Sequence, residues 1–271
     1  MNQTYTLDSS KHELLKNEML EAKIVCVVAN YGFAENASRL KAEMSKSFLT
    51  YLIDSSSPVT PTGTDVVIPN NYYPGLLKAA IKIAESGDFE WLLFIASDVE
   101  IPDPVNFQMR VLEVICDSKI GVYSPTVTAS SRTAYHLLVN QPTGSLREVG
   151  MVEGFIFLTQ VKLLDCLSVP LEKSKFGWAF DLFLCYNAYV NNKVVIADDR
   201  NIVYHPKSKS PIHEELAMKE ALELIPKHVF EWKRSTQAIS RLPRGVKKAL
   251  TFFVNASFLK LNPCKFRVRK K

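Results

Sequence analysis

The feature that most constrains this fold is an alternation of short, almost purely apolar runs with amphipathic stretches along the first hundred residues. Four runs predict strands: Lys23–Ala29, Tyr51–Ile53, Asp65–Pro69 and Trp91–Ala96. Between them, the apolar positions of residues 35–48 and 76–85 recur at helical spacing. Strands separated by helices of this length predict a doubly wound α/β sheet with right-handed crossovers.

The second half of the chain is less regular and predicts mixed strand pairing. Its expected elements are a helix near Val105–Asp117, strands at Ile120–Tyr123, Tyr135–Val139 and Gly154–Leu158, a helix near Phe180–Asn191, and strands at Lys193–Ala197 and Asn201–Tyr204. The segment PKSKSPI interrupts this pattern, so we expect the α/β domain at residues 1–210 and an extension at 211–271. At the other end, a capping box at Ser10–Glu13 predicts a short opening helix.

Charge is divided unevenly along the chain. Residues 1–231 hold all 28 acidic and 21 of the 33 basic residues, a net charge of −7, whereas the last forty hold 12 basic residues and no acidic one. Residues 246–261 mix lysines with clustered Phe and Leu, which predicts a basic amphipathic helix. We expect the tail that contains it, residues 241–271, to bind an anionic membrane surface. A nucleic-acid-binding tail would be more polar, so we expect no nucleic-acid partner. Packing of the aromatic residues on the domain or on a partner subunit is the alternative.

The sequence favours a cytoplasmic protein attached peripherally to the inner face of a membrane. Its five cysteines are an odd number with no C-x-x-C pair, which is typical of a reducing compartment. The first twenty residues lack the apolar core of a signal peptide, and no apolar stretch reaches the roughly 20 residues that a spanning helix requires.

Polar residues follow the predicted strands at the positions where open α/β sheets bind ligands. These residues are Asn30, Tyr31, Asp54, Asn70, Asn71, Asp98 and Glu100. Asp98 follows the most apolar strand, where it either caps the turn before Pro102 or holds a ligand. Asp181 opens an apolar helix, where favourable interaction with the helix terminus, worth about 0.3 to 1 kcal/mol, is the structural alternative.

Six segments, in order, resemble nucleotide-sugar-dependent glycosyltransferases of the GT-A fold, especially the bacterial inverting family 2 enzymes that build surface polysaccharides and lipopolysaccharide. They are IVCVVANYG, YLIDSSSP, Asn70-Asn71 with Pro74-Gly75, LLFIASDVEI, VEGFIFL and GWAFDLFLCYNAYVNNKVVIADDRNIVYHP. The resemblance covers residues 23–206 and implies a Rossmann-like, mostly parallel mixed sheet with flanking helices. It also implies inverting transfer of a sugar from a nucleoside-diphosphate donor to a hydroxyl of a glycan or lipid-linked acceptor.

On the donor side, the resemblance implies roles for Asn30, Tyr31, Asp54, Asn71 and Asp98. Asp98 matches the last acid of the family's DXD motif and would anchor the diphosphate or a divalent cation, Mg²⁺ or Mn²⁺, which prefers hard oxygen ligands. Asp54 would accept from a base N–H or a ribose hydroxyl with Tyr31 beside the ring, although both residues could equally form turns.

The sequence departs from the family at the first acid of DXD, which is Ala96 here. Asp98 is then the remaining carboxylate of the motif, and an ion that enters with the donor's phosphates needs only one. Glu100 would offer a second oxygen if the segment is extended, because alternate residues of a strand share a face. His205 would complete the metal site, the alternative being a packed or solvated histidine before Pro206.

On the acceptor side, Asp181 matches the family's base, which must reach the acceptor hydroxyl to take its proton. Glu153 and Gly154 match the positions where the family shapes its acceptor pocket, Trp178 is a further candidate there, and Arg132 and Arg147 lie in polar loops that flank this segment, where they would face donor or acceptor. Trp178 would stack on a sugar ring or else pack in the core. The two arginines would contact phosphate or else be solvated.

Two further functions compete with glycosyl transfer. A sugar-phosphate nucleotidyltransferase shares the α/β nucleotide layout, but that class predicts a Gly-rich loop with Arg and Lys after the first strand, and NYGFAENASR does not supply one. A non-catalytic, membrane-associated scaffold that kept the fold is the other alternative, and Ala96 is the residue that favours it.

Overall fold

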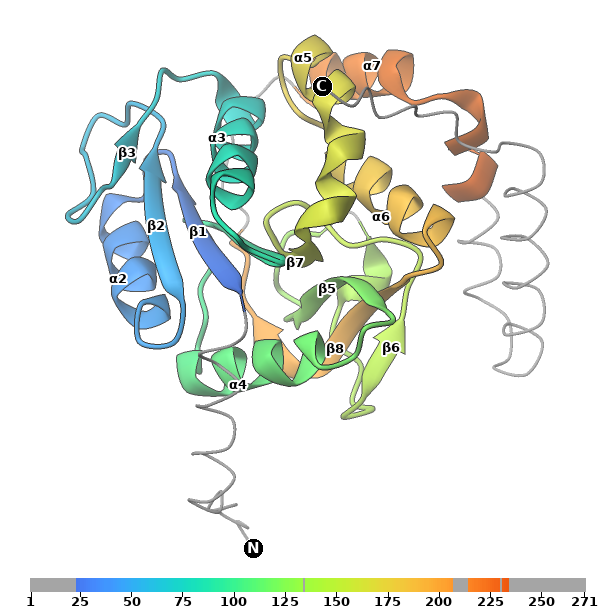
Figure 1. Cartoon of the computed structure of the whole chain (residues 1–271), viewed down its shortest axis with the longest axis horizontal. Coiled ribbons are helices and arrows are strands. Elements are labelled where there is room, and N and C mark those ends of the chain that lie inside the picture. Colours follow the sequence, from blue (N-terminus) through green and yellow to red (C-terminus); the bar gives the residue numbers. More distant parts are fainter. Residues whose placement is uncertain (1–22, 134, 207–213, 230, 234–271) are drawn as a thin grey trace, which may run out of the picture.

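The computed structural model describes residues 23–133, 135–206, 214–229 and 231–233. These residues form an eight-stranded sheet in the order β3-β2-β1-β4-β7-β5-β8-β6 (Figure 1). The strands are β1 (Ile24–Asn30), β2 (Leu49–Asp54), β3 (Val66–Val67), β4 (Trp91–Ala96), β5 (Ile120–Val127), β6 (Leu146–Glu148), β7 (Ile156–Gln160) and β8 (Val194–Val203). The α-helices are α2 (Ala34–Met44), α3 (Tyr72–Ser86), α4 (Pro104–Ile115), α5 (Ser168–Lys173), α6 (Phe180–Val190) and α7 (Glu214–Leu224), with 3₁₀ helices η1 (His136–Leu138) and η2 (Val161–Leu167).

The first half of the sheet is parallel, as the apolar runs predict. β1 pairs in parallel with β2 and with β4, so that Ala29 lies between Ile53 and Ala96. All seven residues of β1 are buried because α2 and α3 both pack on it. This register brings the carboxyl ends of β1, β2 and β4 to one edge of the sheet, where ligands of such folds bind.

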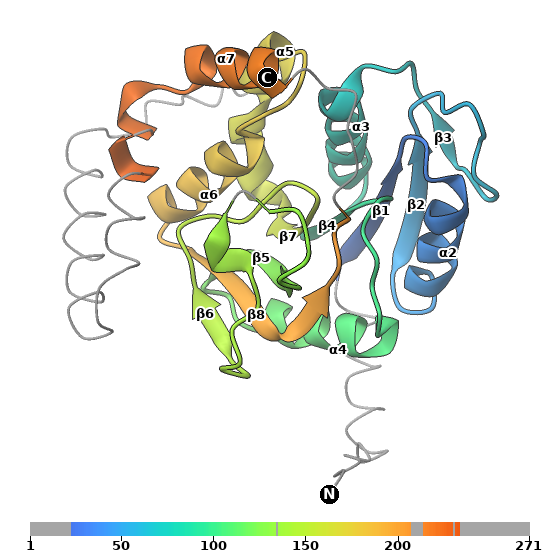
Figure 2. The ribbon, with the colours of Figure 1, turned by 180° about the vertical axis from the view of Figure 1, so that it is seen from behind.

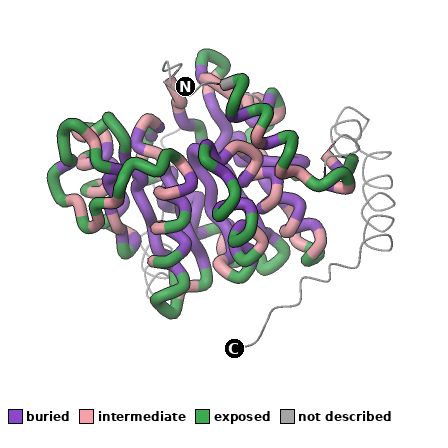
Figure 3. Tube along the Cα trace, turned by 90° about the horizontal axis from the view of Figure 1, so that it is seen from above, coloured by how far each residue is buried: buried purple, intermediate pink, exposed green. Residues whose placement is uncertain are grey.

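The second half supplies the mixed pairing. β7 runs antiparallel between β4 and β5, β5 pairs in parallel with β8, and β6 is an antiparallel edge strand. α2 and α4 touch each other on one face, where Gln108 Nε2 donates to the Glu43 carbonyl at 2.9 Å. On the other face, η2 contacts both α3 and α6, and Figure 2 shows the layers from behind. The strands between the two layers are the buried centre of the molecule (Figure 3).

The prediction of a strand at Tyr135–Val139 is wrong. This segment contains η1 and touches the sheet through one isolated bridge, between Val127 and Val139. The backbone N–H of Tyr135 donates to the Glu153 carboxylate at 2.6 Å, and its carbonyl accepts from Leu138, so both groups are used locally. The apolar pattern arises because side chains of this loop are buried, not because it joins a ladder.

The two strands predicted at Lys193–Ala197 and Asn201–Tyr204 are one continuous strand, β8, with a register shift against β5. The gap between the two predicted strands falls at Asp198 and Asp199, and both side chains are fully buried. Asp198 accepts from Arg110 Nε at 2.8 Å, and Asp199 from Arg147 Nε at 2.7 Å. Because a buried carboxylate is tolerated when it is paired and hydrogen-bonded, the strand continues through a polar stretch.

The described part of the extension packs against the α/β part. α7 lies beside α5 in both views of Figures 1 and 2. Farther along, the ring of Trp232 lies 5.3 Å from that of Tyr186 and 5.2 Å from that of Tyr189, both in α6. None of the helices in the described ranges is long and apolar enough to cross a membrane. The helix predicted from Ser10–Glu13 and the basic tail of residues 241–271 lie outside the described residues.

Candidate active site

A cavity of about 460 Å³ opens at the carboxyl ends of β4 and β8. Seven of the predicted site residues line it: Asp98, Arg132, Glu153, Gly154, Trp178, Asp181 and His205. They come from five separate segments, which meet because the antiparallel β7 begins at the edge where the parallel strands end. Ala96, at the end of β4, also lies on the wall.

Asp98 lies in a turn after β4 that is held by α2. Asn36 Nδ2 donates to the carbonyl oxygens of Ser97 at 2.7 Å and Val99 at 2.9 Å. The Asp98 side chain is 21% exposed, so its carboxylate is accessible from the cavity. Asn36 therefore positions the Asp98 carboxylate through the backbone on either side of it.

The turn also explains why the pairing predicted for Asp98 and Glu100 is wrong. The N–H of Val99 donates to the Ala96 carbonyl at 3.1 Å, so the segment is not extended and alternate residues need not share a face. Glu100 is exposed, lies outside the lining of the cavity, and pairs its backbone with Tyr204. Among the described residues, no three His, Cys, Asp or Glu side chains are grouped closely enough to hold a metal ion.

His205 is the imidazole next to Asp98. Its Nε2 lies 3.3 Å from Asp98 Oδ2, and its Nδ1 lies 2.8 Å from the Arg132 carbonyl oxygen. A carbonyl oxygen only accepts, so Nδ1 carries a proton and donates. Burial acts to lower the pKa of His205, but the hydrogen bond and charge of Asp98, with the Arg132 carbonyl, raise that pKa above its ordinary value.

Asp98 and His205 form a partial fit for a divalent cation. With the proton of the imidazole on Nδ1, the lone pair of Nε2 and the carboxylate oxygen Oδ2 face each other as two acceptors. A proton or a metal ion between them satisfies both atoms. Two protein donors leave most positions of a six-coordinate ion to phosphate oxygens and water, as is usual for Mg²⁺.

Asp181 is placed by a tight turn before α6. Gly177 and Ala179 both have left-handed backbone conformations, with φ of 80° and 74°. The N–H of Leu182 donates to Asp181 Oδ1 at 2.7 Å. Burial raises the pKa of Asp181 to about 6 and the charge of Glu153 adds to this, while the N–H groups of Leu182 and Gly154 and the charge of Lys233 act in the opposite direction. A carboxyl group with this pKa is well matched to proton transfer near neutral pH.

Glu153 and Gly154 bring the start of β7 close to the same turn. Glu153 Oε1 accepts from the Thr133 hydroxyl at 2.9 Å, which ties the loop after β5 to the cavity. The Tyr73 hydroxyl donates to the Gly154 carbonyl at 2.8 Å. A Cβ at Gly154 would lie 2.6 Å from that hydroxyl oxygen, so the position requires glycine for this close approach.

Asn30 and Asp54 lie at the neighbouring strand ends, outside the lining of this cavity. Both residues are fully buried. Asn30 Nδ2 donates to Asp54 Oδ1 at 2.7 Å, and Asp54 Oδ2 accepts from the Ser57 N–H at 3.0 Å. These bonds order the loops after β1 and β2, so a nucleoside would reach either polar group only by exchanging one of them.

The remaining predicted residues also lie away from the cavity lining. Tyr31 is 43% exposed directly after β1, and Asn71 is an exposed residue at the start of α3. Arg147 binds Asp199 through two nitrogens, at 2.7 and 3.0 Å, which gives it a structural partner in β8.

Sequence reasoning missed Glu220, which holds the turn before Asp181. Its carboxylate accepts from the backbone N–H groups of Lys175 at 2.9 Å and Phe176 at 3.0 Å, and from the Ser174 hydroxyl. These hydrogen bonds lower the pKa of Glu220 although partial burial acts to raise it. No local signal identifies this residue, because its partners lie more than forty positions earlier, beyond the predicted boundary.

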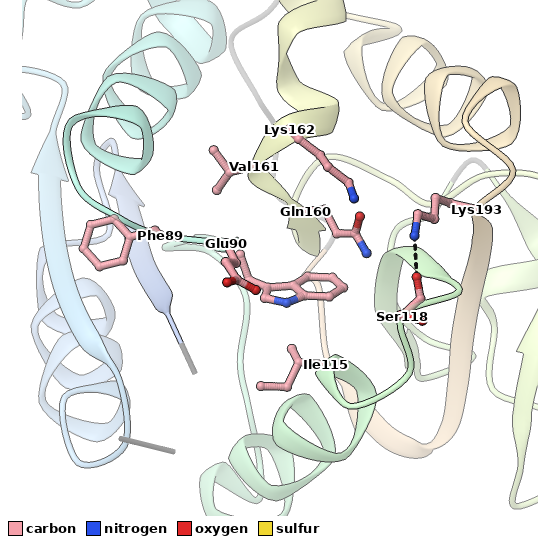
Figure 4. Close-up of a pocket in the computed structure, with 9 residues that line it drawn as sticks. Phe89, Glu90, Ile115, Ser118, Gln160, Val161, Lys162 and Lys193 are labelled. Carbon is pink, nitrogen blue, oxygen red and sulfur yellow. Dashed lines mark hydrogen bonds between the residues drawn. The ribbon is translucent and has the colours of Figure 1, made fainter. Parts of the chain in front are cut away.

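A second cavity, of about 500 Å³, lies at the opposite edge of the sheet, where β4 and β8 begin and β7 ends (Figure 4). Its lining includes Gln160, Lys162 and Lys193 and contains none of the predicted site residues. The chemistry-bearing residues are therefore gathered at the other edge.

No family model matches the sequence, and no curated protein matches it. Among solved structures, the chain is similar to glucosyl-3-phosphoglycerate synthase from Mycobacterium tuberculosis in complex with Mg²⁺ and uridine diphosphate, with a TM-score of 0.55 and 14% identity over 85% of this chain and 84% of that one. It is also similar to a mannosyltransferase from Pyrobaculum calidifontis in complex with GDP-Man and Mn²⁺, with a TM-score of 0.50 and 11% identity over 94% and 88% of the two chains. The chain has the GT-A fold. At these identities the similarity shows the fold alone.

Proposed function

We propose that the protein is an inverting glycosyltransferase that moves a sugar from a nucleoside-diphosphate donor to a hydroxyl of a glycan or lipid-linked acceptor. The observation that carries this proposal is that Asp98 and Asp181, from segments more than eighty residues apart, line one cavity at the ligand-binding edge of a GT-A sheet. An enzyme of this kind needs an anchor for the leaving diphosphate and a base for the attacking hydroxyl.

In the proposed reaction, Asp181 takes the proton of the acceptor hydroxyl as its oxygen bonds to the anomeric carbon. The bond from that carbon to the diphosphate breaks on the opposite face, and the electron pair leaves on the diphosphate oxygen. Asp98 and His205 are the residues that would hold Mg²⁺ or Mn²⁺, and a divalent cation supplies neutralisation of the charge on that leaving group.

The other cavity residues fit supporting roles. All four of these residues line the cavity: Arg132, Glu153, Gly154 and Trp178. In this proposal Arg132 contacts phosphate, Trp178 stacks against a sugar ring, and Glu153 with Gly154 shapes the acceptor side. On the donor side, Asn30, Asp54, Tyr31 and Asn71 surround the strand ends where the nucleoside would lie. We propose that Asn30 and Asp54 support nucleoside binding indirectly, because their hydrogen bonds order the loops that would contact the nucleoside.

The basic tail, residues 241–271, would hold the enzyme on an anionic membrane at the cytoplasmic face, beside a lipid-linked acceptor of surface polysaccharide synthesis. Each basic residue near such a surface contributes about 1 kcal/mol. We expect the full chain to sediment with vesicles containing anionic lipid, and a chain ending at residue 240 to remain in the supernatant. Equal sedimentation of both chains would remove this part of the proposal.

The first test is donor binding and turnover. A thermal-shift series with UDP- and GDP-sugars, with and without Mn²⁺, should give one responding donor, because a ligand at 100 times its dissociation constant stabilises by about 2.7 kcal/mol. That donor should then release its nucleoside diphosphate slowly in the presence of enzyme. Asp181→Asn should stop acceptor-dependent release, and Asp165→Asn, which changes an exposed acid outside the cavity, should not.

The non-catalytic alternative keeps one observation in its favour, the replacement of the first DXD acid by Ala96. A scaffold of this kind would give no thermal shift with any nucleotide sugar and no release of nucleoside diphosphate with any acceptor. A nucleotidyltransferase would instead form pyrophosphate from a sugar phosphate and a nucleoside triphosphate.

A further inference from the structure

The wall of the cavity on the α7 side contains exposed apolar side chains. Met218 and Leu222 line the cavity, although they are 49% and 53% exposed. They are four residues apart and so are neighbours on one helix face. The alanines of the same helix, Ala217 and Ala221, are buried. α7 thus places its small residues inward and two large apolar side chains toward the cavity and solvent.

This wall continues into the residues that surround Asp181. Phe176, Ile225 and Leu182 line the same cavity, and Trp178 lies in the turn between Phe176 and Asp181. A molecule that reaches Asp181 along the α7 side of the cavity therefore lies against apolar side chains, whereas polar side chains such as Arg132 and Glu153 belong to other parts of the lining. Hydroxyl groups on the α7 side would lose hydrogen bonds to water without gaining partners, which costs free energy.

The wall is fixed relative to Asp181. Glu220, in the middle of α7, accepts from the N–H groups of Lys175 and Phe176, directly before the turn that carries Trp178 and Asp181. Hydrogen bonds to a charged acceptor of this kind are stronger than neutral ones. The apolar surface and the candidate base are therefore held together as one unit.

We propose that the acceptor carries a hydrocarbon group next to its reacting hydroxyl, and that Met218, Leu222 and Ile225 bind this group. The inference rests on the proposed function, because it takes Asp181 as the group that meets the acceptor. It goes beyond that function by assigning the apolar recognition to α7, a helix outside the segments 23–206 that carry the family resemblance, and not to the basic tail.

The test measures the binding of n-alkyl glycosides from methyl to octyl, below their micelle concentrations, by calorimetry on the full chain. Transfer of one methylene from water to an apolar surface corresponds to about a fourfold gain in affinity. We expect the affinity to rise with chain length by up to this factor for each added methylene. Affinity that is independent of chain length would overturn the inference.

Three single variants test which side chains cause the dependence of affinity on alkyl chain length. Leu222→Gln and Met218→Gln change half-exposed side chains of the cavity wall, so they should fold and should flatten the dependence on chain length. Leu216→Gln is the matched control, because Leu216 lies on the same helix, is also 53% exposed, and is not among the lining residues. Equal losses in Leu216→Gln and Leu222→Gln would mean that the chains bind α7 nonspecifically, and would overturn the inference.

Failure of this inference can be distinguished from failure of the proposed function. If the thermal shift with a nucleotide sugar is retained while alkyl chain length has no effect, the acceptor assignment is wrong and the transferase proposal stands. If alkyl chains bind through Met218 and Leu222 but no nucleotide sugar binds, the apolar site stands as a binding site and the transferase proposal is wrong.

Discussion

At the scale of single residues, Asp181 combines the two properties that a general base requires. Its side chain is half-buried and borders the cavity, and its pKa is raised to about 6 by burial and by Glu153. The same environment that suits proton transfer disfavours the ionised form in the folded protein. A carboxylate in this environment therefore reduces stability at neutral pH.

Asp181→Asn should stabilise the protein above pH 6 and have little effect near pH 4. The folded pKa lies above the ordinary value of 3.8, so the protonated form favours folding below about pH 4 and this advantage is lost as the pH rises through about 6. The full loss corresponds to about 1 to 3 kcal/mol. Urea unfolding of both proteins at pH 4 and pH 7.5 measures it. A constant difference between the two proteins at both pH values would show that the Asp181 pKa is not raised.

Polar residues next to apolar runs, at strand ends and at the start of α6, were the part of the site that the sequence could predict. Asp98, Asp181 and His205 follow or precede apolar runs, and each lines the cavity. Glu100 could not be placed correctly, because its orientation depends on a backbone turn at Ser97 and Asp98 that residue spacing does not encode. The bond of Asp54 to Ser57 is local, but its bond to Asn30 joins two strands and forms only in the folded sheet.

At the scale of elements, the turn of residues 177–179 decides where Asp181 lies. Gly177 has φ of +80°, and a Cβ there would lie 2.8 Å from Tyr73 Cδ1 and 3.0 Å from Pro74 Cδ. The turn is therefore packed against the start of α3 as well as being left-handed. Both requirements are met only by glycine.

Gly177→Ala should lower the free energy of unfolding more than Gly32→Ala does. Gly32 has φ of +83°, and a Cβ at this position would have no neighbouring atom within 4 Å, so Gly32→Ala reports the backbone cost alone, about 1 kcal/mol. The additional contact at Gly177 should add about 1 to 3 kcal/mol. Denaturant unfolding of the two variants gives the comparison. Equal losses would indicate that the turn can move away from α3 without cost.

Glu220→Ala should loosen the segment of residues 174–177. Removing the carboxylate leaves the N–H groups of Lys175 and Phe176 without their acceptor, and the loss of such bonds costs about 1 to 3 kcal/mol. Hydrogen exchange at these two amides should become faster. Glu223→Ala, an exposed neighbour on the same helix, is the control and should leave their exchange unchanged. Unchanged exchange in Glu220→Ala would show that the hydrogen bonds of Glu220 are not needed to hold this segment.

Elements with strong local patterns were predicted well, and those that depend on distant partners were not. β1, β2 and β4 follow from continuous apolar runs. β8 was divided in two because the arginines that neutralise Asp198 and Asp199 lie about fifty to ninety residues earlier in the chain. The segment at Tyr135–Val139 has the composition of a strand, but backbone groups in it form local hydrogen bonds around η1.

At the scale of the whole molecule, the arrangement of the sheet brings the site together. The parallel strands β1, β2 and β4 end at one edge, and β7 enters antiparallel at that edge, so residues from both halves of the chain face one cavity. The order of alternating elements predicted this class of fold. It did not predict that α7, beyond the expected boundary, forms one wall of the cavity.

Centrally, we propose that Asp98 anchors the diphosphate of the donor, whereas Asp181, in the same cavity, acts on the acceptor hydroxyl and not on the donor. The most direct measurement is calorimetric titration of the nucleoside diphosphate that gives the largest thermal shift, with and without Mn²⁺, into the native chain, Asp98→Asn and Asp181→Asn. We predict that Asp98→Asn weakens binding about tenfold or more, a change of about 1.4 kcal/mol, and removes the dependence on Mn²⁺. Asp181→Asn should bind within about twofold of the native chain, a difference below about 0.5 kcal/mol. Native-like, Mn²⁺-dependent binding by Asp98→Asn would contradict the account.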